Sequence, residues 1–462
     1  MSANLDFESP DRLIAELGEY VAIPSISRSA STETMRAAAE WVAARLAFAD
    51  GRVVETDGFP VVRADWLGAP GAPTILVYGH YDVQPIGNSE EWRTDPFELD
   101  IDGGVVRGRG VSDDKGPVFL VLKLAQAFQT QEGGLPLNVK FLIEGEEEIG
   151  SPNLPAYVRE HSDELAADLV ISADGAQWRP GEPSLSIASK GLVGLDIVVD
   201  GAAIDLHSGR FGGTVANPVH ALSTILASLH EPDGRVAVDG FYEGVADPSG
   251  ERRAEIAAVP FDDEGYKADL GAPALFGEAG FTTLERLWER PTLEITGVIG
   301  GGKYSVIPHT ATAHVSCRLV GAQDPDRVLA SIARHVRSIP VEGVTVQLIE
   351  DAARVPAYHI DATHPAIGAA ADALRTVYPD QDVLLAVIAG TLPATTLFED
   401  ALGAKTLFFS FSTSDENLHA PNEFLRVKRI AEGMRAWESL WRMLAGGEHA
   451  LEPHPSKAKA MR

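Results

Sequence analysis

The sequence has only one cysteine, Cys317, among its 462 residues, and it has no run of 18 apolar residues. A single cysteine excludes a disulfide within the chain, and disulfide-free chains are typical of reducing compartments. The missing apolar run argues against a membrane-spanning helix. The first residues also lack the basic stretch and apolar segment of a secretory signal. We therefore expect a cytoplasmic protein that binds no membrane.

Basic residues are scarce as well. Lys and Arg together number 38 against 67 Asp and Glu, which gives a formal net charge of −29. A chain with this balance repels nucleic acid and anionic lipid, so bulk electrostatics argues against both as partners. Hydrophobic residues make up 45% of the chain and charged residues 23%, which is ordinary for a globular protein with a sizeable core.

Two kinds of pattern divide the chain. Residues 1–189 and 361–462 alternate short apolar runs with helical periodicity, which is typical of an α/β domain built from two separate parts of the chain. Residues 190–360 contain alternating strand-like runs and two longer helical stretches, which predict an α+β domain inserted into the first. Within the insertion, residues 231–280 have the composition of a large surface excursion.

Four apolar runs in the α/β part end at a histidine or an acid. They are TILVY before His80, NVKFLI before the acids Glu146, Glu147 and Glu148, LVIS before Asp174, and TLFFSF before the loop with His419. In an open α/β sheet, ligands bind at the carboxyl ends of the strands. We therefore expect these side chains to converge on one crevice.

Among these features, the glutamate run EGEEEIGS, residues 144–151, should cost the most free energy to bury. Adjacent carboxylates at the end of a buried strand repel one another and lose hydration unless cations or protons compensate. The run therefore predicts a nearby metal ion or base.

The Gly-rich segment GRGVSDDKGP, residues 108–117, leads into a helical pattern and places Asp113 and Asp114 near its first turn. A phosphate-binding loop is the alternative, but the Gly-x-x-x-x-Gly-Lys-Ser/Thr order is absent and the carboxylates would repel phosphate. Acidic metal ligands are the better interpretation.

Mixed histidine and carboxylate donors suit Zn²⁺, Mn²⁺ or Co²⁺, and a hydrolytic centre with two ions needs a bridging carboxylate. Each residue alone has an ordinary structural alternative, such as a core histidine, a helix cap or a turn acid. Their combination favours the metal centre.

Several motifs together resemble the M20 family of metallopeptidases, in particular its carnosinase-type dipeptidase branch. They are GHYDVQP, GRGVSDDKGP, EGEEEIGS, ISADG, DLHSGRFGG and HAPNE, in this order and spacing. The resemblance covers nearly the whole chain. It implies a zinc-peptidase-like α/β catalytic domain with a mixed central sheet flanked by helices, and an inserted α+β lid or dimerisation domain.

The resemblance also implies a division of roles among the site residues. His80 and Asp174 would bind one ion, Glu148 and His419 the other, and Asp113 both; two divalent ions are expected, Zn²⁺ first and Mn²⁺ or Co²⁺ as alternatives. Asp82 would hold the His80 ring and Glu147 would be the general base. Glu146 is left as an exposed acid without a role.

In the inserted domain, the resemblance implies that His207 stabilises the oxyanion in the active site of a partner subunit of a homodimer. Arg318 would bind the substrate carboxylate, and Gly390 would offer backbone groups to the substrate. The branch usually carries an Arg-Glu-Gly-Gly-Ser-like loop, whereas this chain reads AVIAGTLPATTLF at residues 386–398. Because this Arg-Glu pair is missing, the motifs do not determine the substrate specificity.

These inferences predict a two-metal hydrolase that cleaves the amide bond of dipeptides or short peptides with a free carboxylate, using water activated by Glu147. A deacylase of N-acyl amino acids or related small amides is the alternative with the same chemistry. A metal-binding scaffold without catalysis is the alternative of another class.

Overall fold

The computed structural model describes residues 4–302, 304–446 and 451. Two compact units make up the chain. Unit 1 comprises Met1–Ile187, Ile360–Ala386 and Pro393–Arg462, and unit 2 comprises Ala188–His359 and Val387–Leu392.

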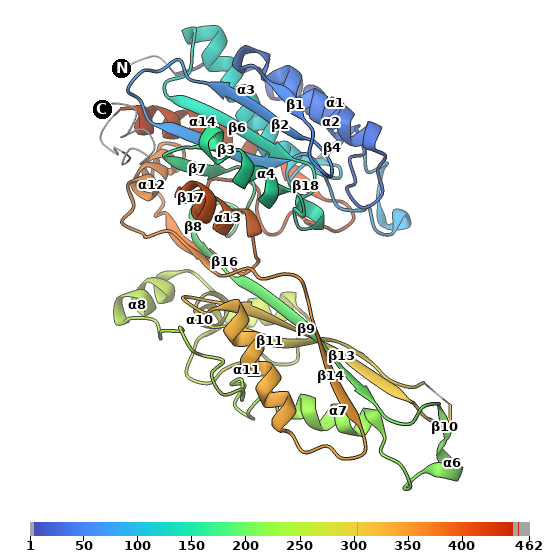
Figure 1. The fold of residues 1–462 in the computed structure, drawn as a ribbon. Coiled ribbons are helices and arrows are strands. Elements are labelled where there is room, and N and C mark those ends of the chain that lie inside the picture. Colours follow the sequence, from blue (N-terminus) through green and yellow to red (C-terminus); the bar gives the residue numbers. More distant parts are fainter. Residues whose placement is uncertain (1–3, 303, 447–450, 452–462) are drawn as a thin grey trace. The chain divides into compact units, whose positions relative to one another are not determined.

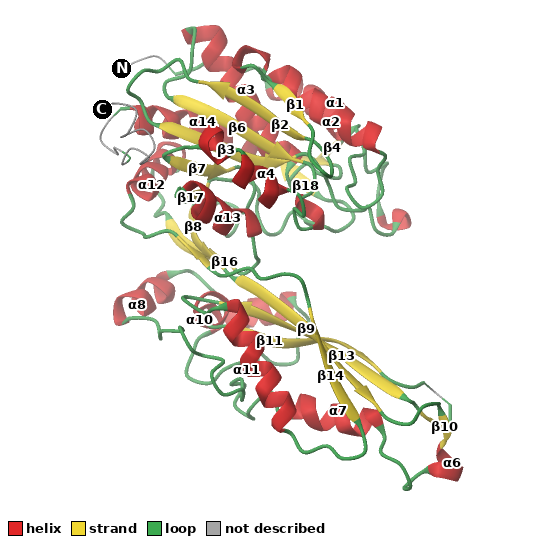
Figure 2. Ribbon diagram, viewed as in Figure 1, coloured by secondary structure: helices red, strands yellow, loops and turns green. Residues whose placement is uncertain are grey.

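A six-stranded mixed sheet forms the centre of unit 1 (Figure 2). Its order is β1 (Arg52–Val54), β2 (Val61–Trp66), β6 (Asn138–Glu144), β3 (Thr74–His80), β7 (Leu169–Ser172) and β17 (Thr406–Phe408). The last four strands run parallel to one another, whereas β2 is antiparallel to both of its neighbours, β1 and β6. Strands β3, β6 and β7 are buried along their whole length, which matches their continuous apolar runs.

Helices cover both faces of this sheet (Figure 1). On one face, Leu76, Tyr78 and Leu142 pack against α4 (Leu154–Glu160), α5 (Ser162–Leu165) and α13 (Pro393–Leu402). On the other face lie α1 (Pro10–Val21), α2 (Thr32–Arg45), α3 (Lys115–Glu132), α12 (Pro365–Val377) and α14 (Val427–Ala445). The α/β fold with a mixed central sheet is therefore confirmed.

The strand ends differ slightly from the sequence pattern. The apolar run TILVY ends at Tyr78, but β3 continues to His80, because parallel pairing with β6 extends to His80 and Glu144. The expected strand from Thr406 to Phe411 is shorter and ends at Phe408. The functional side chains still follow the carboxyl ends of parallel neighbours.

A small antiparallel sheet joins two distant segments of unit 1. Its order is β18 (Phe424–Arg426), β5 (Val105–Arg107) and β4 (Asp100–Asp102). Pairing of β5 with β18 sets the segment just before the Gly-rich loop beside the segment just after His419.

Unit 2 is built on a four-stranded antiparallel sheet with the order β11 (Thr292–Ile299), β13 (Thr310–Leu319), β9 (Gly191–Asp200) and β14 (Thr345–Glu350). Burial alternates along β13, so one face of the sheet is apolar. That face packs against α7 (Pro218–Ala227) and α11 (Pro325–Ser338). Cys317 is buried in this core.

The remaining elements of unit 2 are short. A two-stranded ribbon pairs β10 (Leu206–His207) with β12 (Val306–Ile307), and α6 (Ser208–Phe211) follows β10. The predicted surface excursion at residues 231–280 contains α8 (Gly250–Ala258) and α9 (Asp263–Asp269), and α10 (Thr283–Glu289) follows it. A further three-stranded sheet has the order β15 (Tyr358–His359), β8 (Ser184–Ser189) and β16 (Leu384–Ile388), of which β8 and β16 each contain residues of both units.

Within the described ranges, none of the helices combines the length and the apolar character that crossing a membrane requires.

Candidate metal centre

The carboxyl ends of the parallel strands in unit 1 carry the acidic and histidine side chains of the site. His80 is the last residue of β3, Glu147 and Glu148 form a short 3₁₀ turn after β6, and Asp174 follows β7. Asp113 precedes α3, and His419 lies in the loop between β17 and β18. The parallel topology therefore brings together segments more than 300 residues apart.

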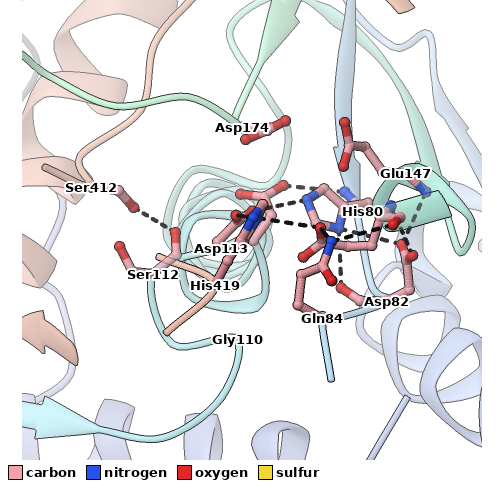
Figure 3. A network of polar contacts seen from close by, with 12 residues as sticks. His80, Asp82, Gln84, Gly110, Ser112, Asp113, Glu147, Asp174, Ser412 and His419 are labelled. Carbon is pink, nitrogen blue, oxygen red and sulfur yellow. Dashed lines mark hydrogen bonds and ion pairs between the residues drawn. The ribbon is translucent and has the colours of Figure 1, made fainter. Parts of the chain in front are cut away.

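Two groups of side chains could each hold a metal ion (Figure 3). In each group the potential ligand atoms all lie within 4.8 Å of one another. The first group is His80, Asp113 and Asp174, and the second is Asp113, Glu148 and His419. Asp113 belongs to both.

The Asp113 carboxylate lies between the two histidines. Its Oδ1 is 3.1 Å from His80 Nε2, and its Oδ2 is 3.0 Å from His419 Nε2. His419 Nε2 is also 3.3 Å from Glu148 Oε2. A carboxylate with one oxygen toward each group has the geometry that a bridging ligand needs.

The neighbouring acid Asp114 is oriented differently. Its side chain is fully buried, and its Oδ2 accepts a hydrogen bond of 3.1 Å from the backbone N–H of His80. Asp114 thus supports the end of β3, whereas Asp113 faces the histidines.

Asp82 holds both His80 and the glutamate turn. His80 Nδ1 is 3.0 Å from the Asp82 carbonyl oxygen and 3.3 Å from its Oδ1. Two acceptors at Nδ1 place a proton on that nitrogen, so Nε2 is the ring atom that would bind a metal ion. The Asp82 carboxylate also accepts the backbone N–H groups of Glu147 and Glu148, at 3.2 and 3.1 Å.

Gln84 contacts the centre but was missed from the sequence. Its Nε2 donates to Glu148 Oε2 at 2.8 Å and to the Glu148 carbonyl oxygen at 3.3 Å. The GHYDVQP motif contains Gln84, but side-chain amides are common in loops, so the pattern alone did not single it out.

The prediction that Glu146 is an exposed acid is wrong. Its side chain is buried, and its carboxylate accepts hydrogen bonds from the backbone N–H of Phe59 at 3.2 Å and from Asn153 Nδ2 at 2.9 Å. The turn after β6 points Glu146 toward these donors, away from the histidines. The two donors offset the cost of burying the carboxylate.

Glu144 is a second missed acid. Its Oε1 accepts hydrogen bonds from Tyr78 Oη at 2.6 Å and from Ser151 Oγ at 2.8 Å. Burial raises its pKa to about 7. The apolar run that precedes Glu144 gave no sign that the strand includes it.

The electrostatics of the two groups fit divalent cations. Burial and the charge of Asp113 raise the pKa of Asp174 to about 6 and that of Glu148 to about 8. Burial, together with the charges of Asp174 and Asp113, raises the pKa of Glu147 well above its ordinary value. These carboxylates destabilise one another in their charged forms, and a bound cation would relieve the repulsion.

The same acids favour the charged form of the two histidines. Burial lowers the pKa of His80, but hydrogen bonds to Asp113 and Asp82 raise it further, so the net pKa lies well above the ordinary value. The hydrogen bond to Asp113 raises the pKa of His419. In the metal-free protein, protonated histidines would offset part of the negative charge that bound metal ions would otherwise offset. With nitrogen and oxygen donors and no thiolate, the set suits Zn²⁺, Mn²⁺ or Co²⁺.

The other predicted site residues, His207, Arg318 and Gly390, belong to unit 2. His207 is exposed, and its Nδ1 accepts the backbone N–H of Gly209 at 3.1 Å. The neutral ring therefore carries its proton on Nε2, where it can donate.

Arg318 touches the segment that replaces the charged loop of the family. Its Nη1 donates to Thr391 Oγ1 at 2.7 Å, and that hydroxyl donates to the Lys190 carbonyl oxygen at 2.6 Å. The Gly390 carbonyl accepts the backbone N–H of Lys190 at 3.0 Å. Thr391 is a polar residue beside Arg318 that the sequence did not single out.

A mixed α/β sheet with two histidine and carboxylate groups at its strand ends defines a metallohydrolase. The profile of Peptidase family M20/M25/M40 matches residues 76–443, and the chain belongs to this family. The family resemblance seen in the motifs is thus confirmed, and with it the prediction of a hydrolytic enzyme.

Known proteins of the family are similar over most of the chain. The Cys-Gly metallodipeptidase DUG1 of Saccharomyces cerevisiae is 30% identical over 81% of this chain and 80% of its own length. The Beta-Ala-His dipeptidase of Homo sapiens is 28% identical over 84% and 78%. The structure of the M20 family metallo-carboxypeptidase Sso-CP2 from Sulfolobus solfataricus is 30% identical, with a TM-score of 0.84 over 94% of this chain and 99% of that one.

The raised pKa values predict how the stability of the metal-free protein depends on pH. The pKa values of Asp174 and Glu148 lie above those of the unfolded chain, as do those of His80 and His419, so the folded state binds more protons. The free energy of unfolding should therefore fall as pH rises from about 5 to about 8.

Differential scanning fluorimetry of chelator-treated protein measures this effect. We expect a melting temperature roughly 2–5 °C lower at about pH 8 than at about pH 6. Added Zn²⁺ should stabilise more at the higher pH, because ligands must be deprotonated to bind it. A metal-free melting temperature that rises over this range would contradict the arrangement of charges.

Proposed function

We propose that this chain is a two-metal dipeptidase that hydrolyses the amide bond of dipeptides or short peptides with a free carboxylate. The observation that carries the proposal is the Asp113 carboxylate, which faces one histidine with each oxygen and belongs to both potential ligand groups. Membership of a peptidase family supplies the reaction class.

In the proposed assignment, His80 and Asp174 would hold one ion, and Glu148 and His419 would hold the other. Asp113, which belongs to both groups, would be shared. The ions would supply positive charge that acidifies a water molecule and polarises the scissile carbonyl. Zn²⁺ is the proposed metal, with Mn²⁺ or Co²⁺ as alternatives, because the donor set accepts all three.

Glu147 is the proposed general base. It takes a proton from the attacking water and later delivers it to the leaving amine. Burial and the charges of Asp174 and Asp113 raise its pKa, which makes the carboxylate a stronger base for the first step. Asp82 supports both residues by holding the His80 ring and the backbone of Glu147.

The substrate class is proposed from the relatives and from unit 2. DUG1 is named a Cys-Gly metallodipeptidase and the human relative a Beta-Ala-His dipeptidase, so two dipeptidases resemble this chain over most of its length. We propose that Arg318 binds the substrate carboxylate, since a guanidinium group can donate to both oxygens. Gly390 and its neighbour Thr391 are proposed to bind the substrate backbone.

The proposed assembly is a homodimer formed through the inserted segment, in which His207 of the partner subunit donates to the oxyanion. This proposal rests on the family resemblance of the DLHSGRFGG motif and on the free Nε2–H of the neutral ring. The proposed location is the cytoplasm, in keeping with the single cysteine.

A substrate panel tests the activity. We expect hydrolysis of Cys-Gly and β-Ala-His, and much weaker hydrolysis of the same dipeptides with an amidated C-terminus, because Arg318 would lose its partner. Stepwise release of C-terminal residues from longer peptides would instead favour a carboxypeptidase like Sso-CP2. Brisk deacylation of N-acyl amino acids without dipeptide turnover would refute the dipeptidase proposal, and binding of metal without any turnover would favour a scaffold.

Replacing the proposed base tests the mechanism. In Glu147→Gln, kcat should fall about 10²–10⁴-fold, while the metal content stays at about two ions per chain. Elemental analysis and steady-state kinetics on the same preparation measure both quantities. Glu146→Gln is the matched control, because the Glu146 carboxylate faces Phe59 and Asn153, and it should keep most of its activity. Activity surviving in Glu147→Gln would remove Glu147 from the mechanism.

Mixed dimers test the proposed role of His207. His207→Ala and Glu147→Gln chains should each be inactive alone, and co-expression should restore roughly a quarter to a half of the wild-type activity if His207 acts in the partner's site. Size-exclusion chromatography first establishes the dimer. Mixed dimers that stay inactive would argue against action across the subunit boundary.

A further inference from the structure

The Gly-rich loop at residues 108–113 is folded around a carboxylate of the same chain. Glu423, the last residue of the HAPNE motif, has a fully buried side chain. Its Oε1 accepts the backbone N–H groups of Ser112 and Asp113, at 2.9 and 3.0 Å. Its Oε2 accepts the backbone N–H of Gly110 at 3.0 Å and Arg109 Nη1 at 2.7 Å.

We propose that Glu423 is a positioning residue for the metal centre, an internal anion that fixes Asp113 relative to His419. The metal-binding part of this inference rests on the proposed function. Three converging backbone N–H groups form the kind of nest that binds anions in other proteins. Here the anion is a side chain from the segment that carries His419.

The neighbouring Arg109 ties a third segment to the same carboxylate. Its side chain is buried, and its Nη2 donates to the carbonyl oxygens of Pro85, at 3.1 Å, and Ala420, at 3.3 Å. Pro85 follows the segment with His80 and Gln84, and Ala420 follows His419. The Arg109–Glu423 pair therefore links the three segments that supply His80, Asp113 and His419.

Ser112, next to Asp113, is held at all of its polar groups by the segment from Ser412 to Glu423. Its N–H donates to Glu423, and its Oγ donates to Glu416 Oε2 at 2.6 Å. Its carbonyl oxygen accepts Ser412 Oγ at 2.6 Å (Figure 3). Asp113 is thus the first residue beyond a segment that has little freedom to move.

The His419 loop benefits from such anchors, because three of its residues lie in the left-handed region. His419, with a φ of 60°, adopts this conformation at a cost, whereas Asn417 and Asn422, with φ values of 54° and 61°, tolerate it better. The Glu423 carbonyl accepts the Gly108 N–H at 3.0 Å, and β18 begins at the next residue and pairs with β5. The anchor on the Asp113 loop is therefore also the anchor of the His419 loop.

A carboxylate is required here, because four donors converge on two oxygens. An ionised carboxylate accepts at both oxygens, whereas a glutamine side chain has one acceptor oxygen and one NH₂ group. In Glu423→Gln, either Ser112 and Asp113 or Gly110 and Arg109 would face an NH₂ group. The loop would have to shift to relieve this contact, and Asp113 would move with it.

Cobalt binding tests the inference with a readout that does not depend on turnover. We expect Glu423→Gln to bind Co²⁺ about 10–100-fold more weakly than wild type by titration calorimetry, with an altered Co²⁺ absorption spectrum. Circular dichroism checks that the variant is folded. Unchanged Co²⁺ affinity and spectrum would overturn the proposal.

Glu438→Gln is the matched control. Glu438 lies in α14 of the same unit, is equally buried, and accepts the backbone N–H of Leu5 at 2.9 Å and Arg435 Nη1 at 3.0 Å. It has the same kind of partners but contacts neither loop of the metal centre. The Co²⁺ affinity of Glu438→Gln should match that of wild type. If Glu438→Gln lost as much Co²⁺ affinity as Glu423→Gln, the loss in Glu423→Gln would reflect general destabilisation.

Chemical rescue tests whether the negative charge is the essential feature. Glu423→Ala removes the carboxylate and leaves the N–H groups of Gly110, Ser112 and Asp113 and the Arg109 guanidinium without their acceptor. Sodium formate should restore Co²⁺ affinity in this variant, and sodium chloride at the same ionic strength should not. Equal effects of the two salts, or no recovery with either, would contradict the role of an internal anion.

The outcomes for this inference and for the proposed activity are separable. Weakened Co²⁺ binding in Glu423→Gln supports the inference even if the wild-type protein hydrolyses no dipeptide. Dipeptide hydrolysis by wild type together with unchanged Co²⁺ binding in Glu423→Gln overturns the inference alone.

Discussion

The mutual repulsion of buried carboxylates is the constraint on which the rest of unit 1 depends. Parallel strands β3, β6 and β7 end side by side, so Asp113, Glu147, Glu148 and Asp174 gather in a small volume. His80 and His419 lie among them, and each contacts one oxygen of the Asp113 carboxylate. Burial, together with the charge of Asp113, raises the pKa of Glu148 and of Asp174, so the charged forms of both carboxylates are disfavoured here. Divalent cations would offset the repulsion between these carboxylates, so the arrangement suits a metal centre better than a hydrophobic core.

Adjacent acids in this chain have different environments because each is held by a different set of donors. Glu146 faces a backbone N–H and an asparagine, Glu148 faces Gln84 and His419, and Asp82 holds the turn between them. Asp113 and Asp114 divide in the same way between the histidines and the end of β3. Turn geometry, which directs neighbouring side chains apart, therefore decides which acid meets which partner.

Two further carboxylates, Glu423 and Glu416, surround the centre without belonging to either potential ligand group. They bind backbone and hydroxyl donors of the Asp113 loop from the segment that carries His419. A loop that resembles a phosphate cradle by its glycines is thus occupied by an internal carboxylate. The chain uses the affinity of converging N–H groups for anions to join two loops that lie far apart in the sequence.

The sequence alone determined the family, the α/β class and the residue types of the centre, because motif spacing and strand patterns are local properties. It also indicated that His80, Glu148, Asp174 and His419 follow parallel strands. It could not determine that Glu146 is buried, that Glu144 bonds to Tyr78 and Ser151, or that Glu423 fills the Gly-rich loop. Those facts depend on donors supplied by segments up to 314 residues away, which become neighbours only when the sheet and the β5–β18 pair have formed. Local pattern selects the chemistry of a side chain, and tertiary contacts decide which partner it meets.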